Sequence, residues 1–236
     1  MRPAQISVVA EPTVLLFDID GTLVLSGGGG RRAMEEAFAE LYGRPDALDG
    51  IDFRGMTDGR IFRRALHTID RPCDDGALAT LVAVYAKHLQ RTVADAESFR
   101  VLPGARELLV VLANHAHVAT GLGTGNVEAG ARIKLGRADL GHFFTFGGFG
   151  SDHDDRAELL RIGARRGAER LGVALQRCRV VVIGDTPLDV EAGRAAGAEC
   201  VTVATGGYPA DQLRAAGADV VFADLGDPRV LPALLG

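Results

Sequence analysis

The chain has 236 residues, of which 47% are hydrophobic and 24% charged, and this length suits one large domain or a core domain with a smaller insert. A formal net charge of −5 argues against a protein that binds nucleic acid through a broad basic face, whereas a small anionic substrate needs only a local positive site. No apolar run approaches the ~18 residues that span a bilayer, and the segment 1–11 lacks a signal-peptide pattern, so we expect a cytoplasmic protein without membrane contact.

The first predicted strand covers residues 14–17, an apolar run that ends in acidic and glycine residues and suits a strand buried on both faces. Roughly 80 residues with helical spacing of their apolar side chains follow, which is too many for a simple crossover. We therefore expect a small helical cap domain at residues 26–99. Its entry, the glycine run at 27–30, imposes no backbone preference and suits a hinge. The core domain then comprises residues 1–25 and 100–236.

Short β-rich runs alternate with helical patterns through the rest of the chain. Alternation of this kind predicts an α/β fold of the Rossmann-like type, in which helices flank both faces of a parallel sheet. The predicted strands are 117–122, 143–146, 179–183, 200–204 and 219–222, and the predicted helices are 103–113, 126–135, 156–171 and 187–196.

Polar side chains follow three of the predicted strands at the point where each strand ends. Because parallel sheets bind their ligands beyond the carboxyl ends of the strands, we expect these side chains to meet at one edge of the sheet. The set comprises Asp18 and Asp20 after the first strand, Thr124, Gly125 and Asn126 after the second, and Asp185 and Asp189 after the fourth.

The four carboxylates of this set need a cation, because a like-charge pair about 4 Å apart costs about 4 kcal/mol at an effective dielectric constant of about 20. A hard divalent ion with oxygen ligands fits, and Mg²⁺ is the usual choice where phosphate is also bound. Zinc is not expected, since neither histidine nor cysteine accompanies these carboxylates and the three cysteines of the chain form no CxxC pair.

Two motifs carry a family resemblance: Asp-x-Asp-Gly-Thr at residues 18–22 and Gly-Asp-x-x-x-Asp at residues 184–189. Through these motifs, and in its layout over nearly the whole chain, the sequence resembles the phosphatase branch of the haloacid dehalogenase-like superfamily and is similar to phosphoglycolate phosphatases. The resemblance implies that Asp18 is the nucleophile, and that Asp20 protonates the leaving group and then activates water. These roles suit hydrolysis through an aspartyl-phosphate, with general acid–base catalysis by a second carboxyl group.

The resemblance also implies how the ion is held. Asp185 is expected to bind Mg²⁺ together with Asp18 and the backbone carbonyl of Asp20, while Asp189 assists directly or from behind these ligands. Dehalogenases of the superfamily lack a carboxyl group at the second position of the first motif. The presence of Asp20 therefore favours phosphoryl chemistry over carbon–halogen chemistry.

The segment after the second strand is expected to bind phosphate. The hydroxyl of Thr124 matches the family residue that binds the transferring phosphoryl group. The backbone amides of Gly125 and Asn126 open a helix whose positive end favours an anion. A dinucleotide fingerprint does not fit the glycines at 121–125, because the third glycine of GxGxxG would fall at Asn126.

One family element is missing. The lysine that usually follows the third strand is absent from residues 150–156. We expect Arg156 to replace it, since a guanidinium can bridge carboxylate and phosphate, although Arg156 could equally pair with acidic residues of its own loop. Lys134 is the fallback, about three turns into the preceding helix and roughly 12 to 15 Å from its anion-binding end. His153, in the same loop, is expected to be solvated or structural.

In the cap, the polar stretch 54–58 is similar to stretches with which family caps contact the substrate, so Thr57 is a candidate substrate-binding residue. A helix start capped by Thr57 or Asp58 accounts for the stretch equally well. Closure of the cap over the sheet edge would exclude bulk water and select the substrate.

The leading hypothesis is a Mg²⁺-dependent phosphatase that acts on a small phosphorylated metabolite, such as 2-phosphoglycolate or a sugar phosphate, as a monomer or a homodimer. Two alternatives stay open. A phosphomutase would use the same site and return the phosphoryl group to a sugar. A non-catalytic phosphate-sensing protein would keep only the fold, and the missing lysine favours it.

Overall fold

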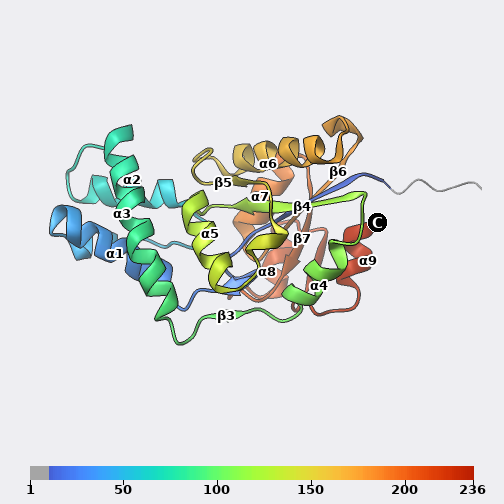
Figure 1. Ribbon diagram of the computed structural model, residues 1–236, viewed down its shortest axis with the longest axis horizontal. Helices are drawn as coiled ribbons and strands as arrows, with labels where there is room; N and C mark the ends of the chain where they lie inside the picture. Colours follow the sequence, from blue (N-terminus) through green and yellow to red (C-terminus); the bar gives the residue numbers. More distant parts are fainter. Residues whose placement is uncertain (1–10) are drawn as a thin grey trace, which may run out of the picture.

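A computed structural model of the chain describes residues 11–236 (Figure 1). Its central sheet has six strands in the order β5-β4-β1-β6-β7-β8, and every neighbouring pair is parallel. The Rossmann-like α/β fold that the alternation of strands and helices predicts is confirmed. Residues 1–10 lie outside the described residues. They include most of the segment in which no signal-peptide pattern was found and the start of the predicted core domain.

The strands follow the predicted apolar runs closely, with one exception treated below. The sheet comprises β1 (Thr13–Phe17), β4 (Val118–Thr124), β5 (Gly147–Phe149), β6 (Arg179–Gly184), β7 (Glu199–Val203) and β8 (Val220–Phe222). The helices around it are α4 (Ala105–Leu112), α5 (Glu128–Arg137), α6 (Arg156–Leu171), α7 (Pro187–Ala196), α8 (Ala210–Ala215) and α9 (Val230–Leu235), with short 3₁₀ turns η2 (Gly141–Phe143) and η3 (Leu175–Arg177).

Strand β1 is buried on both faces because its alternate side chains enter two different apolar clusters. Leu15 and Phe17 pack with side chains of α4, α5 and α9. Val14 and Leu16 pack with side chains of α6 and α7. Helices therefore cover both faces of the sheet, and only its edges and the ends of its strands remain for binding and chemistry.

The parallel register places the predicted site residues at one end of the sheet. Phe17 at the end of β1 pairs with Leu122 of β4 and with Ile183 of β6. The residues that follow these three positions therefore leave the sheet at the same edge. This alignment is the structural reason why the motifs after β1, β4 and β6 meet.

A helical segment is inserted between β1 and β4 and lies beside the sheet, at the left of Figure 1. It contains α1 (Gly29–Tyr42), the 3₁₀ turn η1 (Pro45–Leu48), α2 (Asp58–Thr68) and α3 (Asp75–Ala94), and its buried apolar side chains form a cluster of their own. A short antiparallel pair, β2 (Val24–Leu25) with β3 (Arg100–Val101), joins the two ends of the segment. We accordingly keep residues 26–99 as the proposed cap domain.

The third strand lies elsewhere than predicted. Residues 143–146 were expected to form it, but the strand is β5, and the preceding residues form η2 and an irregular connection. Phe144 is buried in the core beneath the sheet, so its apolar character reflects packing. The true strand contains two glycines with close neighbours. A Cβ atom at Gly148 would lie 1.8 Å from the carbonyl oxygen of Leu159 in α6, and one at Gly147 would lie 2.8 Å from the Cβ atom of Leu122 in β4.

The glycine run at the entry to the insert is only partly free to act as a hinge. Gly27 and Gly28 adopt positive φ angles of 60° and 77°, which suits a turn. Gly29 and Gly30 are already the first residues of α1, so the predicted hinge at 27–30 is too long. Within residues 11–236, no helix is both long and apolar enough to cross a membrane.

Candidate active site

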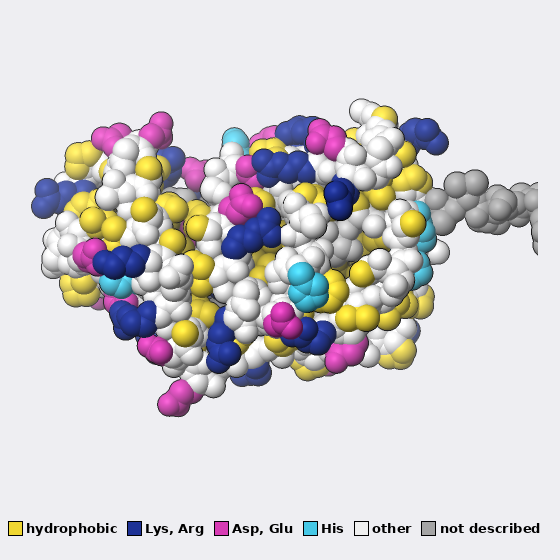
Figure 2. All heavy atoms as spheres, in the orientation of Figure 1, with side chains coloured by type: hydrophobic (Ala, Val, Ile, Leu, Met, Phe, Trp, Pro, Cys, Tyr) yellow, Lys and Arg dark blue, Asp and Glu magenta, His cyan; other side chains and the backbone are white. Residues whose placement is uncertain are grey.

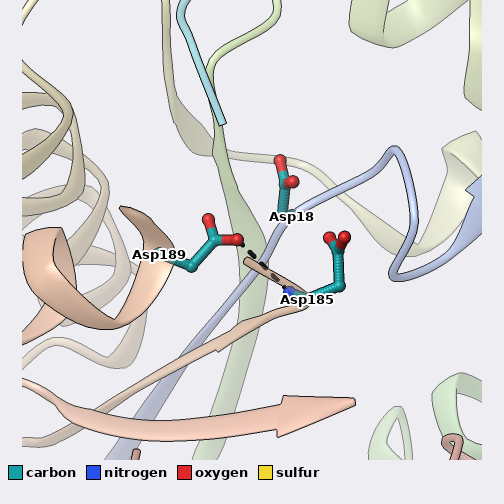
Figure 3. Close-up of side chains that lie close together, drawn as sticks. All are labelled: Asp18, Asp185 and Asp189. Carbon is teal, nitrogen blue, oxygen red and sulfur yellow. Dashed lines mark hydrogen bonds between the residues drawn. The ribbon is translucent and has the colours of Figure 1, made fainter. Parts of the chain in front are cut away.

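Three buried carboxylates meet at the carboxyl edge of the sheet (Figure 3). Asp18 follows β1, Asp185 follows β6, and Asp189 lies in the first turn of α7. One carboxylate oxygen of each residue lies within 4.8 Å of the other two, and the three residues are 7%, 2% and 1% exposed, respectively. The structure thus brings together acidic residues that stand far apart in the sequence, as their positions after parallel strands predict.

The turn after β1 is shaped by the glycine of the first motif. Gly21 has a φ of 87°, and a Cβ atom there would lie 2.4 Å from Oδ2 of Asp185. The next residue, Thr22, donates a hydrogen bond of 3.1 Å to Oδ1 of Asp185, and the hydroxyl of Thr205 donates to the carbonyl of Gly21. Sequence reasoning assigned no role to either threonine; Thr22 had a signal in its motif, whereas Thr205 had none.

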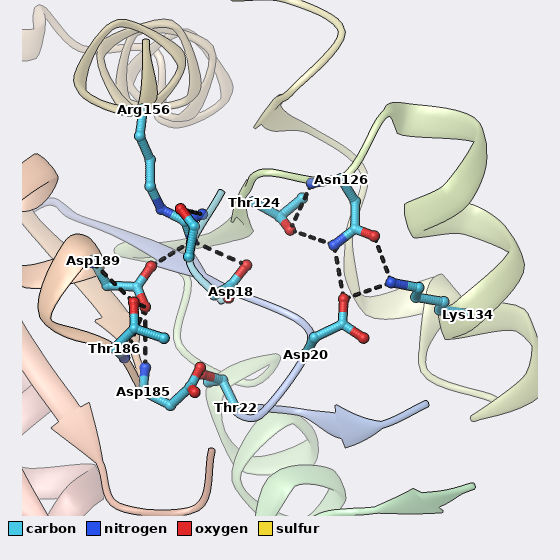
Figure 4. Close-up of polar contacts among 11 residues, drawn as sticks. Asp18, Asp20, Thr22, Thr124, Asn126, Lys134, Arg156, Asp185, Thr186 and Asp189 are labelled. Carbon is cyan, nitrogen blue, oxygen red and sulfur yellow. Dashed lines mark hydrogen bonds and ion pairs between the residues drawn. The ribbon is translucent and has the colours of Figure 1, made fainter. Parts of the chain in front are cut away.

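Arg156, the first residue of α6, reaches two of the carboxylates (Figure 4). Its guanidinium lies 3.3 Å from Oδ1 of Asp18 and forms a hydrogen-bonded ion pair with Asp189. The arginine is 9% exposed, and its Nε has no hydrogen-bond partner among the described residues. The alternative of a surface cluster is wrong, because the acidic residues of the preceding loop have other partners: Asp152 pairs with Arg166, Asp154 pairs with Arg63, and Asp155 accepts from backbone amides of α6 as its N-cap.

The carboxylate of Asp189 is fully engaged by protein groups. Its Oδ2 accepts hydrogen bonds from the backbone amides of Asp185 and Thr186, at 3.2 and 3.0 Å, and from the hydroxyl of Thr186 at 2.7 Å. The bond from the amide of Thr186, together with a bond of 3.2 Å from the amide of Asp189 to the hydroxyl of Thr186, forms the capping box of α7. Oδ1 of Asp189 accepts from Arg156. Asp189 therefore holds Arg156 in place and has little capacity left to bind a cation directly.

A second network surrounds Asp20 on the other side of the loop (Figure 4). Nζ of Lys134 lies 2.5 Å from Oδ2 of Asp20 and donates to Oδ1 of Asn126 at 2.6 Å. The side-chain amide of Asn126 donates to Oδ2 of Asp20 at 3.0 Å and to the hydroxyl of Thr124 at 2.9 Å. Ser26 donates to Oδ1 of Asp20 at 2.9 Å, a contact with no sequence signal. Lys134, Asn126 and Ser26 thus hold the carboxylate of Asp20, and Thr124 holds the side chain of Asn126.

Lys134, the fallback cation, lies closer to the start of its helix than the predicted three turns. Helix α5 begins at Glu128, so Lys134 is less than two turns into the helix. Its long side chain also runs back toward the N-terminal end, as Cα–Cβ bonds in helices do, and is 5% exposed. The structure therefore brings both candidate cations to the site, Arg156 beside Asp18 and Lys134 beside Asp20.

The two carboxylates of the first motif differ in their electrostatic surroundings. Burial raises the pKa of Asp18 to about 6, against the attraction of Arg156, and the charge of Asp189 adds to the rise. At Asp20 burial acts in the same direction, but the charge and hydrogen bond of Lys134, with the bond from Asn126, outweigh it and lower the pKa. Burial and the neighbouring Asp189 and Asp18 raise the pKa of Asp185 well above its ordinary value.

The start of α2 is hydrogen-bonded to the segment that joins β4 to α5. The backbone amide of Asp58 donates to the carbonyl of Gly125 at 2.8 Å, and Oδ2 of Asp58 accepts from the amide of Val127 at 2.9 Å. Thr57 is the N-cap of α2, with its hydroxyl accepting from the amide of Arg60. Thr57 does not line the cavity, so the structure supports the helix-cap interpretation of this residue.

A cavity of about 290 Å³ lies between the sheet edge and the helical insert. This size suits a small metabolite. Its roof contains Met34, Phe53, Met56 and Tyr85, and its floor contains Asp18, Asp20, Asn126, Lys134, Arg156 and Asp185. On the face that Figure 2 shows, Lys and Arg side chains are interspersed with Asp and Glu, so this face has no broad basic patch.

Comparison with known proteins identifies the family. The model of the haloacid dehalogenase-like hydrolases matches residues 12–197, which include both motifs. A phosphoglycolate phosphatase from Pseudomonas putida is 30% identical over 214 residues, covering 85% of this chain and 73% of the relative. Another from Rhodospirillum rubrum is 31% identical over 231 residues, covering 92% and 90%. The similarity to this branch that the motifs indicated is thereby confirmed.

Solved structures show the same fold. CbbY from Rhodobacter sphaeroides, in complex with phosphate, superimposes with a TM-score of 0.69 over 96% of this chain and 99% of that chain, at 19% sequence identity. Together with the family match over most of the chain, this shared architecture leads to one conclusion. The protein belongs to the haloacid dehalogenase-like hydrolase family.

Proposed function

We propose that this hydrolase is a Mg²⁺-dependent phosphatase that acts on a small phosphate monoester, of the 2-phosphoglycolate or sugar-phosphate type, through an aspartyl-phosphate on Asp18. One observation carries the proposal. The carboxylates of Asp18 and Asp20 line the same small cavity, and each is held by its own buried cation, Arg156 or Lys134. The similarity to phosphoglycolate phosphatases supports the same reaction.

The donor set fits Mg²⁺. Asp18 and Asp185 offer buried carboxylate oxygens close to each other, and no histidine or cysteine belongs to the cluster found among residues 11–236. Asp189 is occupied by Arg156 and Thr186, so we assign the ion to Asp18, Asp185 and the backbone carbonyl of Asp20. When bound, Mg²⁺ neutralises these carboxylates and polarises the phosphoryl oxygens.

The reaction proceeds in two halves. In the first, a carboxylate oxygen of Asp18 attacks phosphorus, the bond between phosphorus and the ester oxygen breaks, and Asp20 gives a proton to the leaving oxygen. In the second, Asp20 takes a proton from a water molecule that attacks the same phosphorus atom. Inorganic phosphate leaves, and the carboxylate of Asp18 is restored.

The buried cations and the start of α5 stabilise the transferring phosphoryl group. Arg156 lies against Asp18, where its guanidinium can contact carboxylate and phosphoryl oxygens together. Thr124 and the backbone amides of Gly125 and Asn126 lie at the end of β4, ahead of the N-terminus of α5, where an anion is favoured. Lys134 and Asn126 keep the carboxyl group of Asp20 in one position for both proton transfers.

Replacement of the nucleophile tests the proposal. We expect Asp18→Asn to lower the release of p-nitrophenol from p-nitrophenyl phosphate with Mg²⁺ by at least about 10³-fold, and EDTA to stop the wild-type reaction. Asp211→Asn, the same change at an exposed position of α8, serves as the matched control and should keep the wild-type rate. Near-native turnover by the Asp18→Asn variant would refute the assignment.

The two alternatives give different results in the same assays. A phosphomutase would convert a hexose 1-phosphate into the 6-phosphate without releasing inorganic phosphate. A phosphate-sensing protein would be well folded and release no product from any phosphate ester. Release of inorganic phosphate at a rate matching substrate loss supports the phosphatase alone.

A further inference from the structure

We propose that Tyr85 determines substrate specificity, because its hydroxyl donates a hydrogen bond to a neutral hydroxyl group on the leaving alcohol. The substrate class is then a small polyol or sugar phosphate, in preference to a carboxylate-bearing ester such as 2-phosphoglycolate. This inference rests on the proposed phosphatase function and names the chemistry that the cap recognises.

The hydroxyl of Tyr85 is buried without a partner. Tyr85 belongs to α3, is 0% exposed and lines the roof of the cavity. Its ring packs edge-on against Phe62, with the ring centroids 5.5 Å apart. No group among residues 11–236 forms a hydrogen bond with its Oη. Because a buried hydroxyl without a partner costs stability, its position beside a substrate cavity points to a ligand.

The surroundings of this hydroxyl keep it a neutral donor. Burial raises the pKa of Tyr85 well above its ordinary value, and the charges of Asp58 and Asp20 add to the effect. On the core side, Gly130 of α5 lies next to the hydroxyl, since a Cβ atom there would lie 3.4 Å from Oη, in van der Waals contact. The hydroxyl therefore faces the junction of cap and core, close to two acidic residues of the cavity.

The cations of the cavity already have acidic partners. On the roof, Arg31 pairs with Glu35 and Arg54 with Asp52, each at 2.8 Å. On the floor, Lys134 and Arg156 pair with the carboxylates of the proposed catalytic groups. No lining cation among residues 11–236 therefore lacks an acidic partner.

This charge pattern decides between the two kinds of leaving group. A second carboxylate on the substrate would approach the buried Asp58 and find each neighbouring cation already paired. A hydroxyl group carries no charge to desolvate, and it can accept from Tyr85 while donating its own proton to a neighbouring carboxylate.

The test compares Tyr85→Phe with the wild type on esters that differ in the leaving group: glycerol 3-phosphate, glucose 6-phosphate, 2-phosphoglycolate and p-nitrophenyl phosphate. Of glycerol 3-phosphate and glucose 6-phosphate, we expect the better substrate to have a wild-type kcat/KM at least about tenfold higher than that of 2-phosphoglycolate. Tyr85→Phe should lower kcat/KM for the hydroxylated ester about tenfold, the value of one hydrogen bond, and leave p-nitrophenyl phosphate within about twofold.

Two controls separate recognition from folding. Tyr42→Phe makes the same change on α1 of the cap, at a residue that packs on Phe38 and does not line the cavity, and should alter neither preference nor rate. The melting temperature of Tyr85→Phe should not fall, since the lost hydroxyl has no hydrogen-bond partner within residues 11–236.

Other results would overturn the inference. A wild-type preference for 2-phosphoglycolate, or an unchanged profile in Tyr85→Phe, would show that this hydroxyl does not select the leaving group. An equal loss on all four esters would assign Tyr85 a structural role. Absence of turnover of every ester by wild type, p-nitrophenyl phosphate included, would instead refute the phosphatase proposal on which the inference rests.

Discussion

The two sides of the loop that carries Asp18 and Asp20 are built differently. On one side Arg156 contacts Asp18 and Asp189, and all three residues are nearly inaccessible to solvent. On the other side Lys134 contacts Asp20, whose side chain is 37% exposed. The proposed nucleophile is thus held in a closed ion-pair network, whereas the proposed acid stays accessible to solvent and to the leaving group.

This difference bears on the lysine that family members usually carry after the third strand and that this chain lacks. That lysine is expected to neutralise the phosphoryl oxygens and to hold the nucleophile. Here an arginine at the start of α6 contacts the proposed nucleophile, while the lysine of α5 contacts the proposed acid. A guanidinium can contact several oxygens at once, so Arg156 can serve both Asp18 and Asp189. Removal of Arg156 and removal of Lys134 should therefore have different effects on activity and stability.

The largest effect is expected for Arg156→Ala. The change leaves the buried carboxylates of Asp18 and Asp189 without their cation, so both activity and folding should suffer. We expect kcat/KM for p-nitrophenyl phosphate to fall about 10²–10³-fold, and the free energy of unfolding in urea to fall by about 3–5 kcal/mol. Arg156→Lys keeps the charge without the bidentate geometry, and it should recover stability better than activity. Equal recovery of both would contradict the bridging role.

A smaller effect is expected for Lys134→Met, which keeps the length of the side chain and removes its charge. Asp20 retains hydrogen bonds from Asn126 and Ser26, so the acid loses one of several contacts. We expect kcat to fall about 10–10²-fold while the urea midpoint changes less than in Arg156→Ala. Lys87, the other lysine of the chain, lies exposed on the cap, and Lys87→Met is the matched control. A loss of stability as large as that of Arg156→Ala would remove the distinction between the two sides.

The sequence predicts well which strand-end residues meet, because parallel pairing fixes which residues share an edge. Once β1, β4 and β6 are recognised as apolar runs, the convergence of Asp18, Thr124 and Asp185 follows from their register. It predicts β5 poorly, because the two glycines of this strand, which β4 and α6 approach closely, leave no apolar signal.

The contacts of long side chains were also difficult to predict. Lys134 was judged by the distance of its backbone from the helix start, yet its direction along α5 decides what it reaches. Tyr85 and Ser26 reach the site through the packing of the insert against the core, and no local pattern reports such packing.

The smallest effect is expected for Asp189→Asn on Mg²⁺ binding. This variant tests whether Asp189 belongs to the ion-pair network of Arg156 or binds the ion directly. In the wild type, Mg²⁺ at about 100 times its Kd should stabilise the folded protein by about 2.7 kcal/mol and raise the melting temperature. Asp185→Asn should abolish this rise because it removes a proposed ligand. Asp189→Asn should keep the rise while lowering kcat, since its oxygens are bound by Arg156 and Thr186. A lost Mg²⁺ response in Asp189→Asn would make this carboxylate a direct ligand and leave Arg156 held by Asp18 alone.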